Sequence, residues 1–138
     1  MARLVNVDST CTERQRHRRT VAEALHLLAA KRELDAEARD LAALIVFSLL
    51  AIHEGVERSA AAWDKRNYYI KADRLRAEWA WTDRYASRLA NLIRGGDWGR
   101  LPAVLAEMAP RFCDVHVARL TRSPRLWAGA CERLLGEQ

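Results

Sequence analysis

The longest apolar run in the sequence is residues 41–52, twelve residues of which only Ser48 is polar. A helix needs about 20 apolar residues to cross a bilayer, so this run is too short to span a membrane. A helix that is apolar almost all round is usually central, surrounded by other helices. We therefore expect a buried central helix whose core positions are Leu44, Ile45, Leu49, Ile52 and Val56.

Boundary signals place the first two helices on either side of residue 34. Thr10 and Glu13 have the spacing of a capping box, in which each side chain binds a backbone N–H of the other residue. A helix is therefore expected over residues 10–33, preceded by an N-terminal arm at residues 1–9. Asp35 is the expected N-cap of the central helix, which continues to about residue 63.

Three further helices are expected in the second half of the chain. Residues 66–94 have one apolar stripe and stop at Gly95 and Gly96, as helices commonly do. Residues 101–120 form a fourth helix that Pro110 should kink or break, and a short one follows Ser123 to about residue 135. The sequence thus predicts an all-α fold: a single domain over residues 1–138, an antiparallel four-helix bundle with a short fifth C-terminal helix.

The composition favours a basic protein of a reducing compartment. The net charge is +5, and 20 of the 23 basic residues are arginines, which suit phosphate contacts. An arginine- and alanine-rich genome would also explain this composition. The three cysteines are far apart and odd in number, so no disulfide framework is expected. With no apolar leader at the N-terminus, we expect a soluble, cytoplasmic protein.

An aromatic and basic band runs from Trp63 to Trp98 and holds seven of the ten aromatic residues. On the helix predicted here, Arg74, Trp81 and Arg88 repeat every seven residues, away from the apolar stripe. An exposed Trp81 flanked by arginines could stack on a base, with Arg74, Arg84 and Arg88 neutralising phosphates. Alternatively, Trp81 belongs to a second apolar seam with Ile70 and Ala77, packed against a subunit or the last helix.

A second basic run lies near the start of the first predicted helix. We expect its arginines to neutralise phosphates, although short basic runs are often only a solvated helix turn. Positive charge near a helix N-terminus opposes the macrodipole, a small penalty that favours a functional reason for it. The residues of this run are Arg14, Arg16, Arg18 and Arg19, and a weaker cluster is Arg119, Arg122 and Arg125.

The sequence contains no strong metal or catalytic motif. Glu23 and His26 have the Glu-x-x-His spacing of bundle metal sites, but both should face water and no second such motif occurs. Cys113 and His116 lack a second ligand pair. A trio that could do acid–base work is His53, Glu57 and Asp114. We expect no metal and no cofactor.

These observations favour a non-enzymatic binding module that contacts nucleic acid, with RNA favoured, or a ribonucleoprotein. In size, charge and helix content the chain is similar to the small all-helical subunits of RNA-guided effector complexes, although no motif supports this resemblance. A homo-oligomerising or adaptor bundle with Trp81 at its interface is the alternative. A metal-dependent enzyme built around His53 is a distant third.

Overall fold

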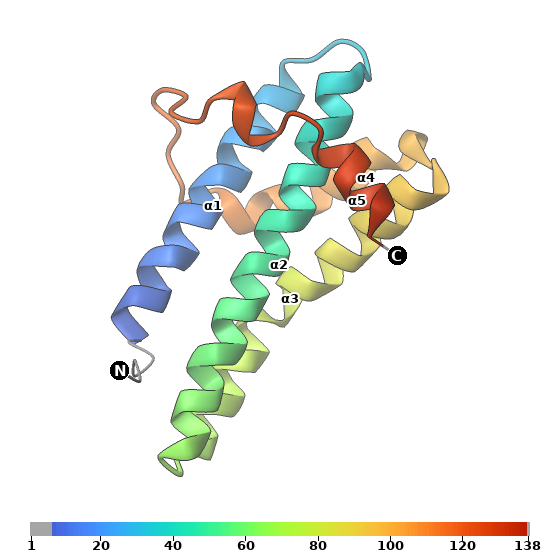
Figure 1. Ribbon diagram of the computed structural model, residues 1–138. Helices are drawn as coiled ribbons and strands as arrows, with labels where there is room; N and C mark the ends of the chain where they lie inside the picture. The colour runs from blue at the N-terminus through green and yellow to red at the C-terminus, as the bar shows by residue number, and fades with distance from the viewer. Residues whose placement is uncertain (1–6, 138) are drawn as a thin grey trace.

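The computed structural model describes the backbone of residues 7–137 and the side chains of residues 11–137, and this part is all-helical, without strands. Its five α-helices are α1 (Val7–Ala29), α2 (Ala36–Lys65), α3 (Tyr69–Gly95), α4 (Leu101–Met108) and α5 (Ala130–Gly136). Three short 3-10 helices are η1 (Trp98–Arg100), η2 (Ala109–Phe112) and η3 (Pro124–Leu126). Figure 1 shows α1, α2 and α3 as the three long helices of the molecule.

Helix α2 is the central element, as its apolar run predicts. It contacts α1, α3 and α5, and all five expected core positions, Leu44, Ile45, Leu49, Ile52 and Val56, are buried. The predicted N-cap is confirmed, because a carboxylate oxygen of Asp35 accepts a hydrogen bond from the Ala38 N–H at 2.7 Å.

The first helix begins earlier than its sequence signals indicate. α1 already includes Val7, so the boundaries expected for the arm and for the helix start are wrong by about three residues. Residues 1–6 of the arm and the Thr10 side chain of the capping box lie outside the described residues. Glu13 instead forms an ion pair with Arg58 of α2 at 2.8 Å.

A tight turn joins α2 to α3. Asn67 has a φ of 63°, a left-handed conformation that asparagine tolerates better than most residues. Only residues 66–68 separate the two helices, and Figure 1 shows the turn at one end of the molecule, in green. At its other end α3 stops at Gly96, also left-handed with a φ of 70°, as predicted.

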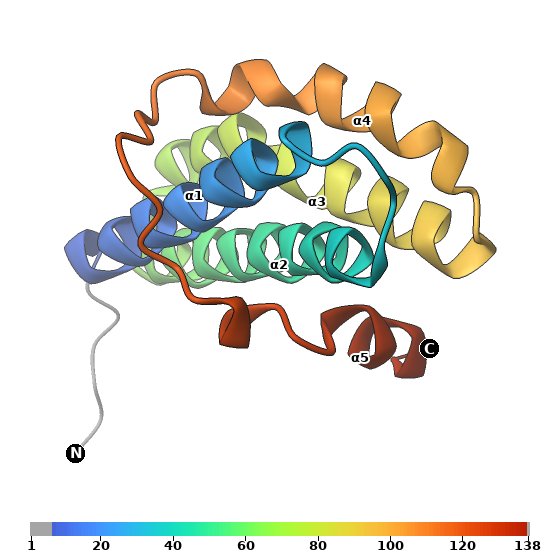
Figure 2. The ribbon, with the colours of Figure 1, turned by 90° about the horizontal axis from the view of Figure 1, so that it is seen from above.

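The predicted fourth helix ends twelve residues early, at Met108. Proline has no N–H to donate, and from Ala109 the chain tightens into the 3-10 helix η2 that contains Pro110. Residues 113–123, here named the strap, then contain turns and bends but no helix. Figure 2 shows the chain leading from the α4 side, past α1, to the side where α5 lies against α2.

The predicted last helix is divided in two. Ser123 caps η3 as expected, accepting a hydrogen bond from the Arg125 N–H at 3.2 Å. Gly129, with a φ of 76°, then separates η3 from α5. Within the part of the chain that the structure describes, no helix combines the length and apolarity that crossing a membrane requires. Cys11, Cys113 and Cys131 are free thiols.

Candidate nucleic-acid interface

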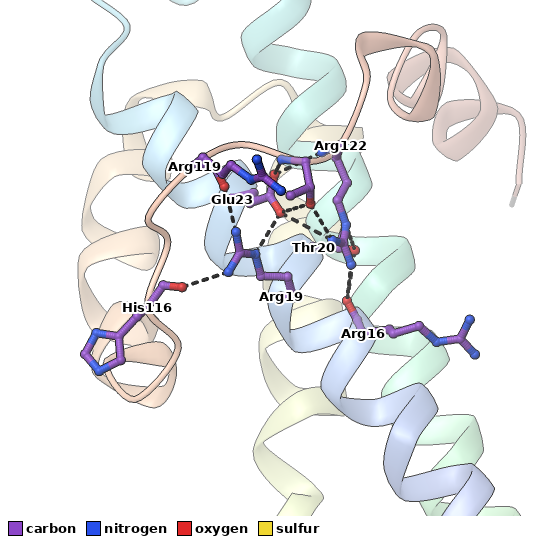
Figure 3. Close-up of polar contacts among 8 residues, drawn as sticks. Arg16, Arg19, Thr20, Glu23, His116, Arg119 and Arg122 are labelled. Atoms are coloured by element: carbon purple, nitrogen blue, oxygen red, sulfur yellow. Dashed lines mark hydrogen bonds and ion pairs between the residues drawn. The ribbon is translucent and has the colours of Figure 1, made fainter.

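Two arginines of the α1 run hold the strap and the segment before it. Arg18 is buried and donates to both carboxylate oxygens of Asp114 and to the Arg111 carbonyl, the latter at 2.8 Å. The hydrogen bond from Arg18 lowers the pKa of the Asp114 carboxyl. Arg19 donates to Glu23 at 2.8 Å and to the carbonyls of His116 and Arg119, both at 2.7 Å (Figure 3).

Glu23 was expected to face water, and that prediction is wrong. Its side chain is buried, and the strap lies over it: it accepts hydrogen bonds from the Thr121 N–H at 2.6 Å and the Arg122 N–H at 3.0 Å. Burial alone would raise the pKa of this carboxyl, but the hydrogen bonds from Arg19, Arg122 and Thr121 outweigh burial and lower the pKa to about 2. Figure 3 shows Glu23 as the centre of this network.

The other two arginines of the run differ in exposure. Arg14 is buried, with its guanidinium 5.2 Å from the centre of the Trp79 ring, and its Nε and Nη1 have no hydrogen-bond partner among the described residues. Arg16 is exposed, and its carbonyl accepts a hydrogen bond from Arg122. Only Arg16 of the four therefore offers an exposed guanidinium that is not already bound.

Trp81 is buried rather than exposed, which corrects the expected stacking surface. Only 5% of the residue is accessible. The ring of Phe112 meets it edge-on at 5.5 Å, and the Arg111 guanidinium lies 5.2 Å from its ring centre. Both residues come from the segment that follows α4. The alternative interpretation, a seam of Trp81 with Ile70 and Ala77 against a subunit or the last helix, is not what covers Trp81: its partners Phe112 and Arg111 precede the last helix, and Ile70 is 71% exposed.

The three predicted arginines of α3 fall into two classes. Arg88 forms an ion pair with Glu107 of α4 at 2.8 Å, and its guanidinium lies 5.5 Å from the Tyr85 ring centre. Arg74 and Arg84 are both exposed, and within residues 11–137 no acidic side chain pairs with either. The predicted phosphate-binding track is thus interrupted at Arg88 and at Trp81.

The exposed aromatic residues of the band lie at its beginning, in residues 63–74, here named the hairpin tip. Tyr68 and Tyr69 are 52% and 57% exposed. Tyr68 meets the Trp63 ring edge-on at 5.7 Å, and the Lys71 ammonium lies 4.7 Å from the Trp63 ring centre and 5.6 Å from that of Tyr68. The Arg66 guanidinium lies 5.8 Å from the Trp63 ring centre. The tip therefore combines cations with aromatic faces.

Three acidic side chains near the hairpin tip are held by one arginine. Arg76 forms ion pairs with Asp64 at 2.8 Å, Glu57 at 3.4 Å and Asp73 at 3.6 Å. Within the described residues, no acidic side chain pairs with the four remaining cations of the tip: Lys65, Arg66, Lys71 and Arg74. The tip therefore presents four positive charges beside exposed rings.

Of these four cations only Arg74 belongs to the site predicted from the sequence. Lys65, Arg66, Lys71 and Tyr69 lie in the band but were left out of that site. The signal that could have found them is the short polar turn Lys-Arg-Asn between two helical segments, because a turn between helices lies at the surface.

The described residues that could bind a metal or act in catalysis do not gather into one site. Among residues 11–137, no three His, Cys, Asp or Glu side chains are close enough together to hold a metal ion. His26 is exposed, as predicted, and so are Cys113 and His116. Glu57 and Asp114, the two carboxylates of the predicted acid–base trio, are bound by different arginines, Arg76 and Arg18.

A groove of about 500 Å³ lies between the C-terminal end of α1 and α4. Its walls are mostly apolar and include Leu28, Trp98 and Leu105. At its rim, hydrogen bonds to Glu37 and Asp35 raise the pKa of the Lys31 ammonium. Lys31 is thus paired with two carboxylates of the same chain. The groove has fewer unpaired basic side chains than the hairpin tip.

Comparison of the chain with models of protein families, with curated proteins and with solved structures found no match.

Proposed function

We propose that this chain is a non-enzymatic binding module that contacts nucleic acid, with RNA favoured, through the hairpin tip. Its scaffold is proposed to be an antiparallel bundle, since short connections join α1 to α2 and α2 to α3. A ribonucleoprotein in the cytoplasm is the proposed setting. The surface differs from the one predicted from the sequence, because Arg14, Arg18 and Trp81 are buried.

The single observation that carries the proposal is the distribution of charge at the tip. Arg76 binds the three nearby carboxylates, so four cations remain for a partner. Salt bridges inside a protein are a common reason for surface arginines, and that reason is missing here within the described residues. Cations that neutralise phosphates release counterions from a nucleic acid, which favours binding strongly at low salt.

The shape of the tip also suits a nucleic acid. Figure 1 shows the α2–α3 turn at the end of the molecule opposite α4 and α5, so that no other element covers it in this view. A narrow protruding tip can reach a phosphate backbone without a large flat interface. Lys71 lies over two rings, which holds its ammonium beside the aromatic surface instead of leaving it free in solvent.

The test is a salt-titrated binding measurement with labelled single-stranded RNA, for the natural chain and for Lys65→Glu/Arg74→Glu. Both residues are exposed, and neither side chain has a hydrogen bond, ion pair or ring contact with a described residue, so the double variant should change charge and leave the fold intact. We expect at least about tenfold weaker binding at low salt. The slope of log K against log salt should fall by about 1.4, since each lost contact with a single strand removes about 0.7.

The matched control is Arg100→Glu/Arg125→Glu, two exposed arginines far from the tip in sequence that make the same change in net charge. Its binding should stay within about twofold of the natural chain. The proposal is lost if the natural chain retains no RNA or DNA at low salt, or if the control weakens binding as much as the tip variant. Binding to vesicles of anionic lipid without binding to RNA or DNA would also contradict the proposal and would indicate a membrane surface as the partner.

The alternative of an oligomer joined through Trp81 has no support in this geometry, because Phe112 and Arg111 of the same chain cover that ring.

A further inference from the structure

Three large apolar side chains in a row are exposed at the hairpin tip. Tyr68, Tyr69 and Ile70 are 52%, 57% and 71% exposed. The other exposed large apolar residues of the described chain occur singly: Leu34, Leu120, Leu126 and Leu135. Single exposed leucines are ordinary, whereas several large apolar side chains exposed together at one turn indicate a place of contact.

Within this patch the two tyrosines have different surroundings. Tyr68 is occupied inside the tip, since Trp63 meets it edge-on and the Lys71 ammonium lies 5.6 Å from its ring centre. Tyr69 has no ring or cation contact with any described residue. Its hydroxyl donates a hydrogen bond of 2.9 Å to the Asn67 amide oxygen. Tyr69 is thus 57% exposed with no described ring or cation over it, while its hydroxyl is anchored.

That anchor comes from the turn itself. Asn67 has the left-handed backbone conformation that closes the turn between α2 and α3, and its side chain accepts the Tyr69 hydroxyl. Anchoring restricts the ring before any partner arrives, so that less conformational entropy is lost on binding. A tyrosine held in this way, next to unpaired cations, has the features of a stacking platform for a base.

We propose that Tyr69 stacks on an unpaired base, so that the hairpin tip selects single-stranded over double-stranded RNA. The inference rests on the proposed function, because the cations of the tip must first bring the phosphate backbone to the ring. In a duplex both faces of each base are covered by its stacked neighbours, whereas a single strand can turn a base out onto an aromatic ring. Phosphate contacts alone would bind single-stranded and double-stranded RNA alike.

The experiment compares a short single-stranded RNA with the same RNA annealed to its complement, at one low salt concentration. The natural chain should bind the single strand more tightly. Tyr69→Ala should weaken binding of the single strand by roughly 5- to 150-fold and leave binding of the duplex within about twofold. Tyr69→Phe keeps the ring and loses only the anchor, so it should retain binding within about threefold of the natural chain.

The outcomes separate this inference from the function on which it rests. If the natural chain binds both RNAs and Tyr69→Ala weakens neither, or weakens both equally, the stacking role is wrong and phosphate binding by the tip stands. If Lys65→Glu/Arg74→Glu also leaves binding of both RNAs unchanged, the proposed function fails as well. Circular dichroism of each variant confirms that the helices are retained.

Discussion

The strap region over α1 and the hairpin tip both contain arginines, but these arginines have different partners. In both regions arginines lie beside aromatic rings and a few acidic residues. Under the strap, Arg18 and Arg19 donate to carboxylates and to main-chain carbonyls of residues 111–119. At the tip, Arg76 pairs with three carboxylates, and within the described residues no acidic side chain pairs with the other four cations.

The difference teaches that a basic run does not by itself show what its arginines do. An arginine covered by another segment, such as Arg18 or Arg19, donates hydrogen bonds to that segment and becomes part of the fold. An arginine at a protruding turn has no segment above it. The strap region should therefore respond to substitution by losing stability, and the tip by losing affinity for a polyanion.

Glu23→Ala should have the largest effect on stability, about 3–5 kcal/mol, because it removes the carboxylate that Arg19, Thr121 and Arg122 share. The free energy of unfolding, measured by urea denaturation, checks this value. The matched control is Glu54→Ala on α2, an exposed glutamate that should change the free energy of unfolding by less than about 0.5 kcal/mol. Equal losses in the two variants would show that the strap is not held by Glu23.

Trp81→Ala should cost about 3–5 kcal/mol, since a buried indole packed against Phe112 leaves a cavity when it is removed. Tyr69→Ala is the comparison from the same aromatic band, and it should change the free energy of unfolding by less than about 0.5 kcal/mol because the ring is 57% exposed. Both values come from the same denaturation experiment. A small loss for Trp81→Ala would mean that the segment after α4 does not cover α3 in solution.

The sequence predicts those parts of the fold that depend on neighbouring residues. The core of α2, the Asp35 cap and the Gly96 stop follow from local spacing, and all three are confirmed. The burial of Glu23 depends on Thr121, 98 residues away in sequence. No helical period contains that information, and for the same reason the cover that residues 111 and 112 place over Trp81 could not be predicted.

The sequence indicated the type of residue in the candidate site, arginines and lysines beside aromatic rings, but not the position of that site on the molecule. The aromatic and basic band contains the hairpin tip, yet heptad spacing on one helix face favoured Trp81 over Tyr69. Helical geometry predicts the direction in which a side chain leaves its own helix. It does not predict which other segment of the chain lies in that direction. The turn at residues 66–68 was the better guide, since the tip is exposed on account of its position between two helices.

Acid should weaken the strap region in a defined pH range. The folded-state pKa of Glu23 is lowered from 4.5 to about 2, so its ion pairs stabilise the fold above about pH 4.5 and are lost as the pH falls toward 2. At 1.36 kcal/mol for each pKa unit, about 2 kcal/mol should be lost between about pH 6 and pH 3.

The measurement for Glu23 is the free energy of unfolding at the two pH values, compared with that of Glu23→Gln. The variant does not titrate at this position, so its loss should be smaller than that of the natural chain by about 2 kcal/mol. Other carboxyls with lowered pKa values, such as Asp114 beside Arg18, are present in both proteins, so their contribution to the loss cancels in the comparison. Identical losses in the two proteins would contradict the assignment of this acid sensitivity to Glu23.

Lys71→Ala should have a small effect on stability and a larger one on binding, and it separates the two regions most sharply. The Lys71 ammonium lies 4.7 Å from the Trp63 ring centre, a cation–π contact worth about 0.5–1 kcal/mol at an exposed site. The same ammonium should contact phosphate, so the variant should bind single-stranded RNA several-fold more weakly at low salt and lose part of the salt dependence. Arg100→Ala removes another exposed cation, far from the tip in sequence, and serves as the control for both measurements. If Lys71→Ala lowers stability without weakening RNA binding, Lys71 only packs against the tip. Its role would then be structural, like that of the arginines under the strap.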